Sequence, residues 1–102
     1  MTRATTQYGQ IEGRLEDGVR GFKGIPFAKS PTGTLRWAVP VAPDKWQDVK
    51  QTTVFGPGSI QAESAMSGLF PEAKEKPVFD EDCLTLNVWA PVDADGSNPV
   101  MV

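Results

Sequence analysis

The side chains that could carry catalysis in this sequence are its serines and acidic residues, because the chain contains no histidine and a single cysteine. Without histidine, no Ser-His-Asp triad, Cys-His pair or His-containing metal site can form within it. One cysteine also excludes internal disulfides and cysteine-cluster metal sites. None of the serines stands in a G-x-S-x-G sequence, although all lie near glycine or proline: Ser30, Ser59, Ser64, Ser67 and Ser97. We therefore assign no catalytic residue to this chain.

The densest group of possible cation ligands is the acidic triplet Asp80-Glu81-Asp82. Consecutive side chains just before a strand point in different directions, so these three carboxylates cannot jointly face one ligand. The sequence accordingly predicts no metal site and no cofactor.

The composition excludes several classes of partner. The chain has 102 residues, of which 13 are acidic and 10 basic, for a net charge of −3, and its basic residues are scattered. A nucleic-acid surface needs clustered Lys and Arg, so no nucleic-acid partner is expected. There is no signal-peptide core and no run of the ~18 apolar residues that cross a bilayer. With the lone cysteine, this favours a cytoplasmic protein with no membrane partner.

The elements that would position any site are short strands and turns, since the chain holds 10 glycines and 9 prolines. Residues 8–25 predict a β-hairpin, with Tyr8–Leu15 against Val19–Lys23 and a tight turn at Asp17-Gly18. Residues 26–44 predict an irregular Pro/Gly-rich connection. Helical periodicity is scarce, so the visible part is expected to be mostly β and loop.

The second half of the chain contains the clearest strand. Alternating side chains predict a strand over 84–90, closed by a proline. Asp44 could cap a single helical turn, and residues 59–70 could hold a short helix, whereas Glu72–Lys76 favours an exposed loop. Residues 99–102 have the pattern of a buried strand cut through its middle. We expect a truncated piece of a longer protein; the alternative is a short edge strand at a true carboxyl terminus.

An ordered series of short motifs runs along the chain. They are Gly24–Ala28 (GIPFA), Pro31–Trp37 (PTGTLRW), Pro40, Trp46, Phe55–Pro57 (FGP), Gln61, Glu81–Pro91 (EDCLTLNVWAP) and Pro99–Val102 (PVMV). The series resembles the amino-terminal region of type-B carboxylesterases, the cholinesterase-like and para-nitrobenzyl-esterase-like branch of the α/β-hydrolases. The resemblance covers roughly residues 6 to 102 and includes the E-D-C-L-x-L-N-V-W block.

The resemblance implies an α/β fold, of which residues 1–102 would be an incomplete amino-terminal segment of a single catalytic domain. The strand at 84–90 would belong to the central sheet, and 99–102 would lead into a Gly-rich oxyanion-hole segment. The G-x-S-x-G nucleophile and the acidic and histidine members of the triad would follow later. The parent protein would then be a serine carboxylesterase that acts through an acyl-enzyme, and this segment alone would be inactive.

The resemblance also assigns structural roles. It implies an ion pair between Arg36 and Glu81 that ties the Pro-rich segment to the strand, buried or half-buried. Many members have a disulfide here, but this chain has Ser59 at the matching position, so Cys83 is left without a mate. The Ω-like loop over 55–82 would therefore be held by packing alone, as in a non-secreted member.

The same loop bears on the substrate. Cholinesterases carry in it a tryptophan that stacks on the choline ammonium, whereas residues 62–79 contain none. The expected substrates are small-molecule esters of short to medium chain length. Leu69, Phe70 and Phe79 are candidates for lining the entrance, although ordinary packing is the role that the sequence favours for them.

Two other functions stay open. The parent could be a non-catalytic, adhesion-type binding member of the same fold, or the 102 residues could be a truncated relic that acts as a small binding module. Nothing in the sequence indicates an oligomeric state.

Overall fold

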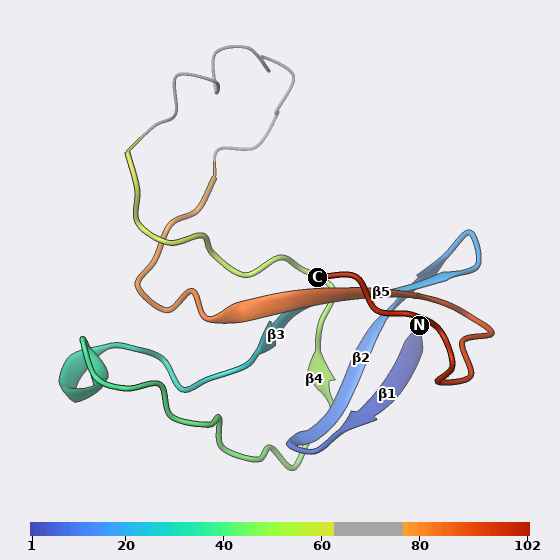
Figure 1. The fold of residues 1–102 in the computed structure, drawn as a ribbon, viewed down its shortest axis with the longest axis horizontal. Helices are drawn as coiled ribbons and strands as arrows, with labels where there is room; N and C mark the ends of the chain where they lie inside the picture. The colour runs from blue at the N-terminus through green and yellow to red at the C-terminus, as the bar shows by residue number, and fades with distance from the viewer. Residues whose placement is uncertain (63–76) are drawn as a thin grey trace.

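A computed structural model describes residues 1–62 and 77–102 of the chain (Figure 1). Several sequence predictions lie outside the described residues. These are most of the possible helix at 59–70, the loop at Glu72–Lys76, and the candidate lining residues Leu69 and Phe70. The described elements are β1 (Thr2–Thr6), β2 (Gly9–Glu16), β3 (Val19–Pro26), the 3-10 helix η1 (Gly33–Leu35), β4 (Lys50–Gln51) and β5 (Thr85–Pro91). The described part is thus mostly strand and loop, as expected.

The predicted antiparallel hairpin is confirmed as β2 and β3. These strands pair through Arg14↔Gly21, Leu15↔Arg20 and Glu16↔Val19. The connection is the two-residue turn Asp17-Gly18, with φ of +50° and +76°. A turn with both central residues left-handed matches the right-handed twist of the flanking strands, which is why Asp-Gly is favoured here.

Strand β1 was not predicted from the sequence. Its five residues, TRATT, contain no apolar alternation, but three are β-branched threonines, which suit an extended backbone. It pairs with β2 in antiparallel register from Thr2↔Gly13 to Thr6↔Gly9. A strand formed by a nearly polar sequence fits an edge position, and β1 is the outer strand of the order β1-β2-β3-β5.

Strand β2 changes partners along its length. Its first half pairs with β1 on one edge and, through Ile11 and Glu12, with the parallel strand β4 on the other. Its last three residues pair with β3 instead. The change occurs beside Gly13, where a side chain would overlap the carbonyl oxygen of Gly21 on β3. Figure 1 shows the resulting crossing, with β3 and β5 running across the hairpin end of β2.

Strands β3 and β5 form the third antiparallel pair. Their register shifts between Phe22 and Ile25, where β3 bulges. Gly24 lies in this bulge with φ +71°, and a side chain there would meet the carbonyl oxygen of Val54. The amide of Gly24 donates to Asn87 Oδ1 at 3.0 Å, so β5 satisfies the donor that the bulge releases.

The middle of the chain has no helical turn at Asp44, contrary to that expectation. The backbone amide of Trp46 donates to Tyr8 O at 2.9 Å, and its indole Nε1 donates to Gln10 O at 2.8 Å. These bonds hold the segment against the start of β2 in an extended path that ends in β4. Long-range hydrogen bonds outweigh the weak propensity of so short a helix.

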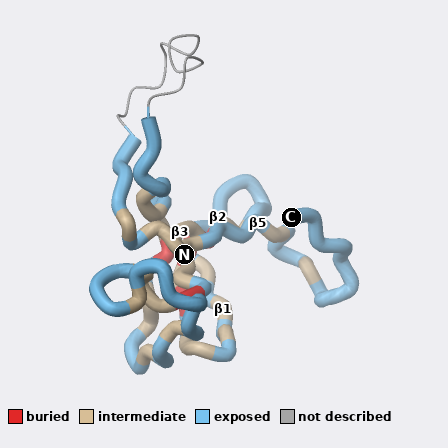
Figure 2. The backbone as a smooth tube through the Cα atoms, turned by 60° about the vertical axis from the view of Figure 1, so that its left-hand side comes forward, coloured by how far each residue is buried: buried red, intermediate tan, exposed pale blue. Residues whose placement is uncertain are grey.

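Few side chains are buried in the described part of the chain. Those that are buried are Ile11, Phe22, Ala28 and Thr52. Figure 2 shows the buried positions where β1, β2 and β3 come together, with most of the remaining tube exposed. Strand β5 exposes side chains on both faces, including Leu86, Val88 and Trp89.

The end of the described chain has no regular secondary structure over 99–102, and its side chains are exposed. The strand expected there stays a prediction. None of the helices in the described ranges is long and apolar enough to cross a membrane.

Candidate functional site

A buried, hydrogen-bonded polar residue lies where β4 enters between β2 and β3. Thr52, just after β4, is fully buried. Its amide and its hydroxyl both donate to the carbonyl oxygen of Glu12 on β2, at 2.8 and 2.9 Å. Its own carbonyl accepts from the amide of Lys23 on β3 at 2.8 Å. Thr52 therefore joins two strands that have separated from each other, and we call it the junction residue.

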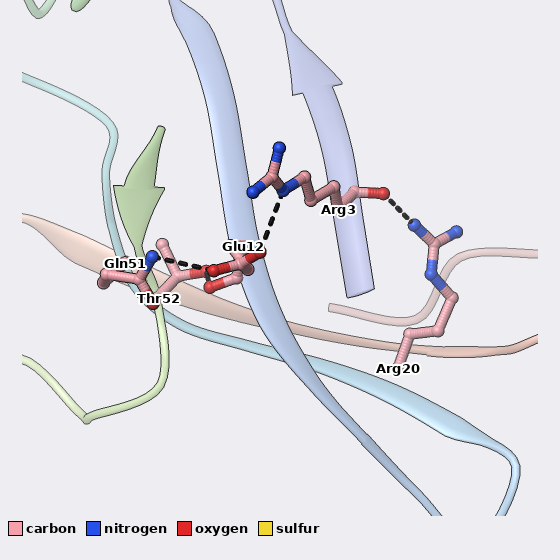
Figure 3. A network of polar contacts seen from close by, with 5 residues as sticks. All are labelled: Arg3, Glu12, Arg20, Gln51 and Thr52. Atoms are coloured by element: carbon pink, nitrogen blue, oxygen red, sulfur yellow. Dashed lines mark hydrogen bonds and ion pairs between the residues drawn. The ribbon is translucent and has the colours of Figure 1, made fainter. Parts of the chain in front are cut away.

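The carboxylate of Glu12 holds the strands on both sides of β2 (Figure 3). Its Oε2 accepts from Gln51 Nε2 on β4 at 2.9 Å, and its Oε1 accepts from Arg3 Nε on β1 at 2.8 Å. These two hydrogen bonds, with the charge of Arg3 adding to them, lower the pKa of Glu12 below its ordinary value of 4.5. Each carboxylate oxygen thus fixes one neighbouring strand.

Arg20 binds the same amino-terminal end of β1. Its Nε donates to Thr2 Oγ1 at 2.8 Å. Its Nη2 donates to the carbonyl oxygen of Arg3 at 2.6 Å (Figure 3). Sequence reasoning treated this arginine as part of a solvated mixed surface and did not find the network. No local signal marks it, because the partners of Arg20 are 17 and 18 residues away and those of Glu12 are up to 40 residues away.

Arg36 and Glu81, placed together by the resemblance, lie together in the structure. Arg36 follows η1 and its Nη2 lies 2.5 Å from Glu81 Oε1, in the segment before β5. The two side chains are 58% and 36% exposed. For a pair so open to solvent the expected coupling is about 0–1 kcal/mol, well below the 3–5 kcal/mol of a fully buried pair.

The acidic triplet does not converge on a ligand. Asp80 Oδ1 accepts from the amide of Asp82, which turns the backbone and leaves Glu81 to face Arg36. Within residues 1–62 and 77–102, no three Asp, Glu or Cys side chains are arranged to hold a metal ion.

The remaining candidate residues lie along the two ends of the 55–82 loop. Cys83 is a free thiol of intermediate exposure. Ser59 follows Gly58, which pairs with Phe79 in a parallel bridge. The Phe79 ring packs 3.3–3.4 Å from where a Cβ of Gly58 would stand, and the residue is 37% exposed. Phe79 therefore helps to join the two ends of the loop.

The described surface hollows do not assemble a reaction centre. One hollow of about 250 Å³ lies over the β2–β3 hairpin. Its lining includes side chains of both charges and the indole of Trp89. The chain has no histidine that could serve as the base of a serine nucleophile.

Known proteins match most of the length of this chain. The sequence model of the Carboxylesterase family matches residues 1–102. The para-nitrobenzyl esterase of Bacillus subtilis (strain 168) is 42% identical over 98 residues, which are 96% of this chain and 19% of that protein. The liver carboxylesterase of Sus scrofa is 42% identical over 107 residues, covering 98% of this chain and 19% of that protein.

Solved structures agree with the sequence relatives. A PNB esterase structure superposes with a TM-score of 0.79 at 42% identity, covering 88% of this chain and 18% of the other. A carboxylesterase of Geobacillus stearothermophilus gives a TM-score of 0.72 at 37% identity, covering 89% and 16%. The predicted fold class, the amino-terminal portion of an α/β-hydrolase, is confirmed.

The chain spans about a fifth of the length of the curated relatives it matches. Because the family model extends over all of residues 1–102 and the backbone follows that of PNB esterases, the chain belongs to the carboxylesterase family.

Proposed function

We propose that this chain is the amino-terminal part of a serine carboxylesterase. The observation that carries the proposal is the match of the Carboxylesterase family model over residues 1–102. The reaction is acyl transfer: a serine attacks the ester carbonyl, a histidine carries protons, and backbone amides stabilise the oxyanion until water releases the acid. All of these groups are expected outside the 102 residues.

The contribution of this chain to the reaction is positional. The β2–β3–β5 sheet is the start of the central sheet in this proposal, and residues 99–102 continue as the strand that leads to the oxyanion-hole segment. The Arg36–Glu81 pair ties the Pro-rich connection to the entry of β5, and its 2.5 Å separation supports that role. Backbone donors of an oxyanion hole must be held to within fractions of an ångström, so such ties matter for rate.

The proposed substrates are small-molecule esters with short to medium acyl chains. The relatives include proteins named para-nitrobenzyl esterase and phenmedipham hydrolase, 42% and 39% identical to this chain. Residues 62–79 lack the tryptophan expected for choline esters. Phe79, with Leu69 and Phe70, is proposed to line the entrance to the site, and the half-exposed ring of Phe79 is available for that contact.

We further propose a cytoplasmic location. Cys83 has Ser59 where many family members have its disulfide partner, so the loop over 55–82 does not depend on an oxidising compartment.

The test is an ester assay on the native protein. We expect hydrolysis of para-nitrophenyl acetate and butyrate to exceed that of long-chain esters, and a serine-reactive phosphonate to abolish it. The isolated 102-residue chain is the matched control and is expected to be inactive. A native protein that neither hydrolyses any ester nor reacts with the phosphonate would instead be a non-catalytic binding member of the fold.

A further inference from the structure

Two Asp-Gly pairs occur in the described chain, Asp17-Gly18 between β2 and β3 and Asp95-Gly96 after β5. In such a pair the glycine amide nitrogen can attack the aspartyl side-chain carbonyl carbon, because glycine has no side chain to obstruct it. The ring closes to a succinimide with loss of one water. Addition of one water to either ring carbonyl then gives aspartate or isoaspartate.

The two glycines present nearly the same surroundings to this reaction. Gly18 and Gly96 both have positive φ, +76° and +89°. No atom lies within 4 Å of the point where a Cβ would stand at either position. Steric access to the nitrogen therefore does not distinguish the pairs.

The two carboxyl groups differ. Asp95 Oδ1 accepts from Ser97 Oγ at 2.5 Å and from the Ser97 amide at 2.9 Å. These two bonds lower the pKa of Asp95, and the bond from the Ser97 hydroxyl has the larger effect. They therefore favour the carboxylate, which is a poorer electrophile than the carboxylic acid. Among the described residues, Asp17 is exposed and its carboxylate takes part in no hydrogen bond or ion pair.

We propose that Asp17 is a site of spontaneous isomerisation to isoaspartate through the succinimide, and that Ser97 protects Asp95 from the same reaction. The backbone of Asp17 lies at φ +50°, in the left-handed region that the tight turn requires. This inference is independent of the proposed function.

Isomerisation at Asp17 has a structural consequence. Isoaspartate adds a methylene group to the backbone of a two-residue turn that sets the register Glu16↔Val19. The turn also supplies the carbonyl of Gly18, which accepts from the amide of Val92 at 2.9 Å. The hairpin and the end of β5 are therefore expected to loosen together as the protein ages.

The experiment follows both sites in one molecule. The native protein is incubated near neutral pH in water enriched in the heavy oxygen isotope, and peptide mapping measures isoaspartate and incorporated label at positions 17 and 95. We expect conversion at Asp17 about tenfold faster than at Asp95, on the order of the factor that one or two hydrogen bonds impose. In concentrated urea the two rates should converge, because the sequences are alike and the fold is gone.

Two variants complete the design. Ser97 is exposed, so its replacement by alanine should not disturb the fold. Ser97→Ala should raise the rate of isomerisation at Asp95 about five- to tenfold and leave the rate at Asp17 unchanged. Asp17→Glu, which would need a larger ring, should abolish conversion at 17. Conversion at Asp95 that equals or exceeds Asp17 in the native protein, or a Ser97→Ala variant with no change at Asp95, would overturn the proposal.

Discussion

At the scale of single residues, the junction depends on the hydroxyl of Thr52. The hydroxyl and the amide of Thr52 share one acceptor, Glu12 O, in a fully buried position. Replacement by valine keeps the shape and removes only the hydroxyl donor. Because the acceptor keeps its backbone partner, no buried group is orphaned, and the expected loss is the net value of one hydrogen bond.

Thr52→Val is therefore expected to lower the free energy of unfolding by about 1 kcal/mol. Thr53→Val is the matched control, since Thr53 is the next residue and less buried. Urea denaturation of the native protein measures both. Equal midpoints for the two variants would show that the Thr52 hydroxyl contributes nothing.

Glu12 gives a prediction with pH. Its pKa is lowered in the folded chain by the hydrogen bonds from Gln51 and Arg3. A carboxyl with a lowered folded pKa stabilises the fold above its unfolded pKa and loses that contribution as pH falls through the folded value. The contribution is thus complete at neutral pH and declines below the ordinary pKa of 4.5.

The measurement is the difference in unfolding free energy between the native protein and Glu12→Gln at several pH values. The difference should be constant above about pH 5 and shrink as the solution is acidified. Glu16→Gln is the control, because Glu16 makes only a long, exposed contact of 3.9 Å with Arg14. A difference for Glu12→Gln that grows toward acid pH would contradict the role of the Glu12 carboxylate in holding β1 and β4 to β2.

At the scale of elements, the crossing of β2 and β3 depends on a missing side chain. A methyl group on Gly13 would overlap the carbonyl oxygen of Gly21, and neither backbone can move away without breaking the ladder. We expect Gly13→Ala to cost about 1–3 kcal/mol.

Gly21→Ala is the matched control on the facing strand. Its new Cβ would lie 3.4 Å from the Trp89 ring, an ordinary contact. We expect a change within about 0.5 kcal/mol. Thermal unfolding of both variants decides the matter, and a Gly13→Ala protein as stable as Gly21→Ala would mean that the strands can separate at little cost.

The Arg36–Glu81 pair links two elements, the connection after η1 and the segment before β5. Its exposure predicts a coupling energy of about 0.2–1 kcal/mol that falls as salt is added. A double-mutant cycle with Arg36→Met and Glu81→Gln in the native protein measures it. A coupling above about 3 kcal/mol would mean that the pair is buried in the whole protein, as the family resemblance allowed.

Elements were predictable where local chemistry determines them. Asp17-Gly18 specifies a two-residue turn whatever surrounds it, and the alternation in residues 84–90 predicts β5 to within one residue. β1 and β4 were missed because their polar sequences become strands only when β2 offers hydrogen-bonding edges. The helical turn at Asp44 failed for a related reason, since Trp46 bonds to Tyr8 and Gln10.

The candidate site was predictable to a different degree. The lack of histidine shows from composition alone that no histidine-dependent triad lies within these residues, and the wider prediction of no catalytic residue stays a prediction. The Arg3–Glu12–Gln51 network could not be found in the same way, because its members come from three strands whose pairing no local pattern encodes.

At the scale of the whole molecule, the described part of the chain has a very small hydrophobic core. Its buried apolar side chains are Ile11, Phe22 and Ala28, whereas β5 exposes both faces. So little buried apolar surface does not offset the conformational entropy of ordering about a hundred residues. We expect the isolated 102-residue chain to fold only in part and to aggregate through β5. A single cooperative thermal transition with dispersed amide resonances at low concentration would contradict this.

The measurement that tests the central claim most directly is the intact mass of the native polypeptide after reaction with a serine-reactive phosphonate. Membership in a working carboxylesterase predicts one phosphonate adduct on a polypeptide several times heavier than the 11.0 kDa of these residues. A native product near 11.0 kDa, or a longer one that takes no adduct, would contradict it.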